Sequence, residues 1–81
     1  MTEAQVLAHI QDIVVRLVRE KGGAAPTVSA ETELLGDDVG IDSLDLATLV
    51  RELEDLTGHD PFADGFVDFR TAAELARLYA R

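Results

Sequence analysis

Cysteine is absent from the 81 residues of this sequence, and lysine occurs only once, as Lys21. A chain without cysteine forms no disulfide, no thiolate nucleophile and no cysteine-ligated zinc site. The sequence also lacks the basic segment and apolar run of a secretory signal, and it has no apolar stretch long enough to cross a membrane. These absences favour a cytoplasmic protein whose own side chains supply no thiol.

Basic residues are scarce as well. Seven Lys and Arg residues stand against 16 Asp and Glu residues, which gives a formal net charge of −9. An acidic surface repels the phosphates of nucleic acids and the headgroups of anionic lipids, so neither nucleic acid nor membrane is an expected partner. Because 47% of the residues are apolar, the chain can form a core and need not be disordered. We expect a single domain over residues 1–81, a monomer that binds proteins with basic surfaces.

The N-terminal part of the sequence predicts a helix over about residues 3–21. Apolar side chains recur at three- and four-residue spacing between positions 6 and 18, as on one face of a helix. Thr2 and Gln5 have the spacing of a capping box at its start. Gly22 suits the left-handed conformation that commonly follows a helix end.

Two further helices are predicted from similar signals. Asp42 is a favoured N-cap residue before an amphipathic segment that Gly58 ends. Thr71 begins a second capping-box pattern, and the residues after it predict a final helix over about 72–80.

The connections complete the expected fold. The loop over residues 22–41 is long for a small domain and needs apolar anchors, for which Val28, Leu34 and Leu35 are candidates. The segment 59–69 mixes turn residues with aromatics, and we expect one short helix there, with the aromatics filling the core. The sequence therefore predicts an all-α fold, a small four-helix bundle of three main helices and one short helix.

Catalytic and metal-binding patterns are weak. His9 and His59 lie on separate elements and are expected to be ordinary surface residues. Residues 60–65 resemble part of a calcium loop, but Phe62 and Thr71 stand where oxygen ligands belong. We expect no catalytic residue and no metal site. One carboxylate cluster is expected to attract divalent cations only weakly, and it consists of Asp37, Asp38, Asp42 and Asp45.

One serine has a context that suggests chemistry. Ser43 follows the Asp42 cap, where the free amides and the positive end of a helix dipole favour an attached phosphate. Taken alone, a serine beside an aspartate cap is a common helix start. Residues 40–44, Gly-Ile-Asp-Ser-Leu, are followed by an acidic amphipathic helix over 44–55, with similar lengths of chain on either side. In this combination the sequence resembles the acyl carrier proteins over essentially its whole length.

The resemblance implies a function for Ser43. In acyl carrier proteins, a phosphopantetheinyl transferase attaches 4′-phosphopantetheine from coenzyme A to this serine. The thiol of that arm holds acyl groups as thioesters, which accounts for a chain without cysteine. The resemblance thus implies a carrier that is not itself an enzyme, and enzymes that load and transfer acyl groups are its partners. These partners read the second helix, where we expect Leu44 as an apolar anchor and the following acidic contacts: Asp42, Asp45, Glu52, Glu54 and Asp55.

Some features differ from the pattern of fatty-acid carriers. Thr48 stands where those carriers have an acidic residue, Arg51 adds a positive charge nearby, and the segment 34–40 is slightly longer than usual. These departures favour a specialised pathway, such as polyketide biosynthesis. A closed core is expected between the helices. Seven residues are the candidates to line an acyl-sheltering space instead: Leu46, Leu49, Leu53, Phe62, Phe69, Ala72 and Leu75.

Two alternatives stay open at this point. A peptidyl or aminoacyl carrier would also use a modified serine, but its motif commonly has Gly-Gly before Asp or His, whereas Gly40 and Ile41 precede Asp42 here. An unmodified acidic helical adaptor would bind a basic protein through charge alone, with Ser43 as part of a helix start. Since the chain starts at Met1 and finishes within its last helix, we expect a stand-alone protein.

Overall fold

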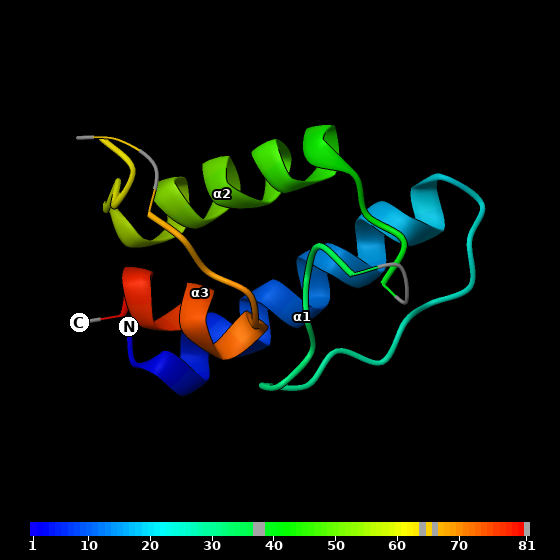
Figure 1. The fold of residues 1–81 in the computed structure, drawn as a ribbon, viewed down its shortest axis with the longest axis horizontal. Helices are drawn as coiled ribbons and strands as arrows, with labels where there is room; N and C mark the ends of the chain where they lie inside the picture. The colour runs from blue at the N-terminus through cyan, green and yellow to red at the C-terminus, as the bar shows by residue number, and fades with distance from the viewer. Residues whose placement is uncertain (37–38, 64, 66, 81) are drawn as a thin grey trace.

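Three helices make up the regular structure of the described residues (Figure 1). The computed structural model describes residues 1–36, 39–63, 65 and 67–80. The helices are α1 (Glu3–Glu20), α2 (Ser43–Thr57) and α3 (Ala72–Tyr79). Within the described ranges there is no β-strand, only an isolated bridge between Glu33 and Thr71. The prediction of a small all-α fold is therefore confirmed.

Helix α1 begins and ends close to the predicted positions. Thr2 accepts a hydrogen bond from the backbone N–H of Gln5 at 3.2 Å, and the Gln5 side chain accepts one from the N–H of Thr2 at 2.9 Å. This is the capping box that the sequence predicts. Six side chains of α1 are buried in the core: Val6, Ile10, Ile13, Val14, Leu17 and Val18. Helix α1 packs against both other helices, whereas α2 and α3 contact each other least.

Helix α2 is capped at both ends but is less deeply buried. Asp42 caps its start, and Gly58 follows it with a φ of 75°, in the left-handed region that glycine adopts without strain. Only Leu49 and Leu53 are fully buried, while Leu46 is half-buried. Much of α2 therefore stays available to solvent and to partners.

The long loop runs beside the start of α3 (Figure 1) and is hydrogen-bonded to it. The backbone N–H groups of Ala72 and Ala73 donate to the carbonyl oxygens of Thr32 and Ala30, both at 2.9 Å. These amides belong to the first turn of α3, which has no intrahelical partners for them. Residues 30 and 32 of the long loop therefore supply hydrogen-bond acceptors for the free amides at the start of α3.

Two of the three predicted loop anchors are buried. Val28 and Leu34 belong to the core, together with Val39 and Ile41. Leu35 is 53% exposed, so its prediction as an anchor is wrong. The two leucines are adjacent in the sequence, and the backbone of Leu34 is held against the segment before α3, which directs only its own side chain inward.

The short fourth helix is not confirmed. The described part of the segment 59–69 forms turns: Ala63 donates its N–H to the carbonyl oxygen of Asp60 at 3.2 Å, and the Asp60 carboxylate accepts from Phe62 N–H at 3.1 Å. Phe69 is buried and Phe62 packs against the core, as expected for the aromatics. Two residues of this segment, Asp64 and Phe66, lie outside the described part.

Candidate functional site

Ser43 is the first residue of α2 and is exposed. Asp42 Oδ1 accepts a hydrogen bond from Asp45 N–H at 2.9 Å, and Asp42 N–H donates to Asp45 Oδ2 at 3.1 Å. This reciprocal cap brackets Ser43 and fixes the direction in which the helix starts. The serine hydroxyl therefore lies at the positive end of the helix dipole, at a turn whose backbone is well defined.

The chain before Ser43 is fixed by a turn and by burial. Gly40 has a φ of 84°, a left-handed conformation that disfavours residues with a Cβ atom. Val39 and Ile41 on either side of it are buried. The backbone that leads to the serine is thus anchored in the core, while the serine itself faces solvent.

Lys21 connects the end of α1 to this turn. Its Nζ donates to the carbonyl oxygen of Gly40 at 2.8 Å and to the carboxylate of Asp45. The hydrogen bond from Lys21 lowers the pKa of Asp45, and the backbone hydrogen bond from Asp42 lowers it further. Sequence reasoning gave Lys21 no role.

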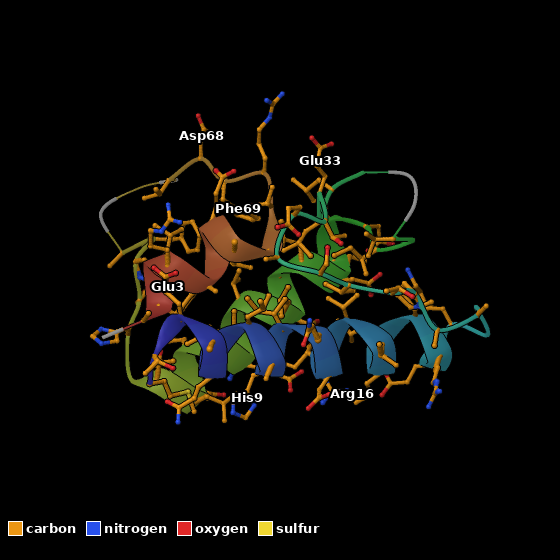
Figure 2. The ribbon with its side chains drawn as sticks, turned by 90° about the horizontal axis from the view of Figure 1, so that it is seen from below. Glu3, His9, Arg16, Glu33, Asp68 and Phe69 are labelled. Atoms are coloured by element: carbon orange, nitrogen blue, oxygen red, sulfur yellow. The ribbon has the colours of Figure 1, made fainter. Side chains whose placement is uncertain are left out.

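A second ion pair ties α2 to α1. Arg16 Nη1 donates to Glu52 Oε1 at 3.0 Å, and its Nη2 donates to the other oxygen of the same carboxylate. Arg16 also lies 3.6 Å from Glu20, measured from Nε to Oε1. The hydrogen bonds with Glu52 raise the pKa of Arg16. Figure 2 shows Arg16 and His9 on the same side of α1. Both residues line a groove together with Glu52.

An open cavity lies on the other side of α2, beside Ser43. Its volume is about 550 Å³. Its lining comes from α2, from the segment before α3 and from the end of α3. The lining residues are Ser43, Leu46, Ala47, Val50, Arg51, Glu54, Asp55, Asp60, Phe62, Phe69 and Tyr79.

Three aromatic side chains form one wall of the cavity. The ring of Phe62 is 6.2 Å from that of Phe69 and 6.4 Å from that of Tyr79, measured between centroids. The Tyr79 hydroxyl donates to the carbonyl oxygen of Val50 at 3.3 Å, which links α3 to α2. Burial raises the pKa of Tyr79 to about 12, with a contribution from the carboxylates of Asp60 and Glu54.

The seven candidates for an acyl-sheltering space divide into two groups. Leu46, Phe62 and Phe69 line the cavity. The other four are fully buried in the core and are absent from its lining: Leu49, Leu53, Ala72 and Leu75. The sequence pattern distinguishes apolar from polar positions, but which apolar side chains border the space depends on how the helices cross.

The predicted partner contacts also fall into two sets. Leu44 is 79% exposed, which suits an apolar anchor, and Asp42 is exposed at the helix start. Glu54 and Asp55 are exposed and line the cavity. Two other predicted contacts are already held by basic residues of the chain itself, Asp45 by Lys21 and Glu52 by Arg16.

No metal centre emerges from the described part of the chain. Nowhere in it do three or more histidine or acidic side chains gather in a way that could hold a metal ion. Asp37 and Asp38, which belong to the predicted carboxylate cluster, lie outside the described residues. His9 and His59 are half-exposed.

The family model described as "Phosphopantetheine attachment site" matches residues 9–79, and the chain belongs to this family. It is therefore a carrier domain whose prosthetic group is covalently attached 4′-phosphopantetheine. This finding favours a carrier over an unmodified adaptor. In the three described helices, no segment is both long and apolar enough to cross a membrane.

A solved structure gives a more specific likeness. The chain is similar to MacpD, an acyl carrier protein from Pseudomonas fluorescens involved in mupirocin biosynthesis. The two are 37% identical, the match covers 98% of this chain and 71% of that chain, and the TM-score is 0.81. A search of curated proteins found no significant match. Family and structure together identify the chain as an acyl carrier protein in fold and function.

Proposed function

We propose that Ser43 carries the 4′-phosphopantetheine arm and that the protein itself is non-catalytic. The exposed hydroxyl at the capped start of α2, bordering the cavity, is the observation that supports this assignment. Ser29 is the other serine of the sequence, and its hydroxyl lies 3.2 Å from that of Thr32 in the long loop. Ser29 follows no helix cap, so it lacks the setting that favours a phosphodiester.

The cavity beside Ser43 is proposed to receive the acyl chain at the end of the arm. Its volume of about 550 Å³ falls within the range of small-molecule sites. Leu46, Phe62 and Phe69 offer apolar surface, while Arg51, Glu54 and Asp60 place charges in its lining. An apolar chain attached at Ser43 would gain free energy by leaving water at this surface.

The pathway is proposed to be a specialised one, such as polyketide biosynthesis. The likeness to a carrier protein involved in mupirocin biosynthesis supports this proposal. Thr48 and Arg51 support it as well, because both are exposed on α2 and reduce the negative charge of this surface relative to fatty-acid carriers. Gly40 and Ile41 before Asp42 favour an acyl carrier over a peptidyl carrier.

The proposed partners are a phosphopantetheinyl transferase and enzymes that load and transfer acyl groups. Their basic surfaces would meet the exposed residues of α2, with Leu44 as an apolar contact and Asp42, Glu54 and Asp55 as acidic contacts. Asp45 and Glu52 would contribute only in competition with Lys21 and Arg16. We expect the protein to act as a cytoplasmic monomer in a single domain over residues 1–81.

The attachment site is tested by intact mass. The purified protein is incubated with coenzyme A and a broad-specificity phosphopantetheinyl transferase. We expect the wild-type protein and Ser29→Ala to gain the mass of one phosphopantetheine and Ser43→Ala to gain none, with equal helicity by circular dichroism. A mass gain in Ser43→Ala, or none in the wild-type protein beside a modified control carrier, would contradict the assignment.

A further inference from the structure

We propose that Lys21 is a positioning residue for the attachment site: it fixes the turn that presents Ser43 and offsets the negative charge around the attached phosphodiester. The proposal rests on the attachment of the arm to Ser43. It gives a role to the single lysine of the sequence, which lies at the end of α1 and outside the serine motif.

The contacts of Lys21 lie on both sides of Ser43 in the sequence. Its Nζ donates to the carbonyl oxygen of Gly40, three residues before the serine, and to the carboxylate of Asp45, two residues after it. One side chain at the C-cap of α1 therefore holds both ends of the turn. Helix α1 is anchored by six buried side chains, so it gives this contact a rigid base.

The Asp45 carboxylate also takes part in the helix cap. The same oxygen that accepts from Lys21, Oδ2, accepts from the N–H of Asp42 at 3.1 Å. Only 14% of the Asp45 side chain is exposed, against 41% for that of Lys21. An ion pair shielded in this way holds its geometry better than one between two freely exposed side chains. Lys21 thus keeps Asp45 in the rotamer that the cap requires.

Charge gives Lys21 a second effect. A phosphodiester on Ser43 adds a negative charge to a residue that lies between the carboxylates of Asp42 and Asp45. Like charges repel each other, and this repulsion would be felt as the serine oxygen loses its proton and bonds to the pantetheine-side phosphorus of coenzyme A, while adenosine 3′,5′-bisphosphate leaves that phosphorus. The ammonium group of Lys21 bonds to one of these carboxylates and lowers the local negative charge.

Arg16 provides a matched comparison. It also joins α1 to α2 through an ion pair, but its partner Glu52 is seven residues beyond Asp45, about 10 Å further along the helix axis. Neutralising either basic residue changes the net charge equally and removes one ion pair to α2. Only the change at Lys21 affects the turn that carries Ser43.

The proposal predicts a specific kinetic pattern. Loss of Lys21 misplaces the serine hydroxyl, which slows the transfer step, but it also releases Asp45 and makes the surface more acidic. A transferase with a basic surface would bind such a variant at least as well. The defect should therefore appear in kcat, with KM unchanged or lower. A partly unfolded variant would behave differently: only its folded fraction would act as substrate, so its apparent KM would be higher.

The experiment measures the kinetics of modification by a phosphopantetheinyl transferase, with holo-protein quantified by mass. We expect Lys21→Met to lower kcat about tenfold, as for a small misplacement of a reacting group, and Lys21→Arg to restore most of it. Arg16→Met should retain the wild-type kcat. In an Asp45→Asn background, Lys21→Met should lower kcat by less than it does in the wild type, because only the contact with the Gly40 carbonyl oxygen then remains to be lost.

Three results would overturn the proposal: a wild-type kcat in folded Lys21→Met, an equal loss of kcat in Arg16→Met, or a full additional loss from Lys21→Met in the Asp45→Asn background. If Lys21→Met does not fold, the proposal is tested by comparing Lys21→Arg with Asp45→Asn. Lys21→Arg should keep most of the wild-type kcat, whereas Asp45→Asn should lower it. A wild-type protein that gains no mass would refute the attachment at Ser43 and this proposal together, whereas modified wild type with an unaffected Lys21→Met refutes only the role of Lys21.

Discussion

The two sides of α2 differ in how they are held. On one side, which we call the closed flank, Leu49 and Leu53 are buried, Glu52 is bound by Arg16 of α1, and Asp45 is bound by Lys21 at the C-cap of α1. The other side, the open flank, consists of the α2 residues that line the cavity: Ser43, Leu46, Ala47, Val50, Arg51, Glu54 and Asp55. The difference shows how one short helix keeps its position and still leaves a surface for cargo and partners.

The largest difference between the flanks should appear in stability. Leu49→Ala removes a fully buried side chain from the closed flank and should lower the free energy of unfolding by about 2–5 kcal/mol. Leu46→Ala removes a half-buried side chain that already borders open space, so its cost should be about 1 kcal/mol. Urea denaturation of both variants, followed by circular dichroism, measures the difference. Equal losses would mean that the cavity is closed in solution.

The wall of the open flank can be probed through Tyr79. Its pKa is raised to about 12 from an ordinary value of 10.0, chiefly by burial. A raised pKa of a neutral acid means that folding favours the protonated form. The contribution of Tyr79 to the free energy of unfolding is therefore constant below the pKa of the unfolded state, near pH 10, and is lost as the pH rises toward 12. Tyr79→Phe should lack this component of the alkaline loss.

Tyr79 can be followed directly because it is the only tyrosine and the sequence has no tryptophan. The ultraviolet absorbance of the ionised phenol should titrate near 12 in the folded protein and near 10 in urea. Comparison of the urea midpoints of wild type and Tyr79→Phe above pH 10 provides the control. A folded-state titration near 10 would show that the ring is open to solvent and that the aromatic wall does not shield it.

Local signals in the sequence account for what could be predicted. The start of α1 follows from Thr2 and Gln5, and the start of α2 follows from Asp42, because a cap is formed by residues three positions apart. The short helix expected in the segment 59–69 has no such support, because the expectation rests on aromatics among turn residues. In the described part of that segment, Asp60 stabilises turns instead.

Only those parts of the site that are close together in the sequence could be predicted. The serine motif and its cap lie within a few residues, whereas Lys21 meets Asp45 across 24 positions and Arg16 meets Glu52 across 36. Pairings of this kind depend on how α1 and α2 cross, which periodicity does not determine. A signal for Lys21 was nevertheless present: it is the one lysine of a strongly acidic chain, and it lies at a predicted helix end.

The smallest expected difference concerns docking. Glu54 on the open flank and Glu52 on the closed flank are two residues apart, and Glu→Gln removes one negative charge at either position. Because Arg16 already neutralises Glu52, Glu52→Gln should change the affinity for a basic partner little. Glu54→Gln removes an exposed charge and should weaken binding about three- to fivefold, as for a single rim charge.

Titration with a phosphopantetheinyl transferase at low and high salt measures this difference. The effect of Glu54→Gln should be larger at low salt, where exposed charges are less screened, and should shrink as salt is added. Ser43→Ala serves as the common background, since it prevents modification during the titration and leaves both carboxylates unchanged. A greater loss from Glu52→Gln than from Glu54→Gln would place the partner on the closed flank, where it would have to displace Arg16 in order to bind.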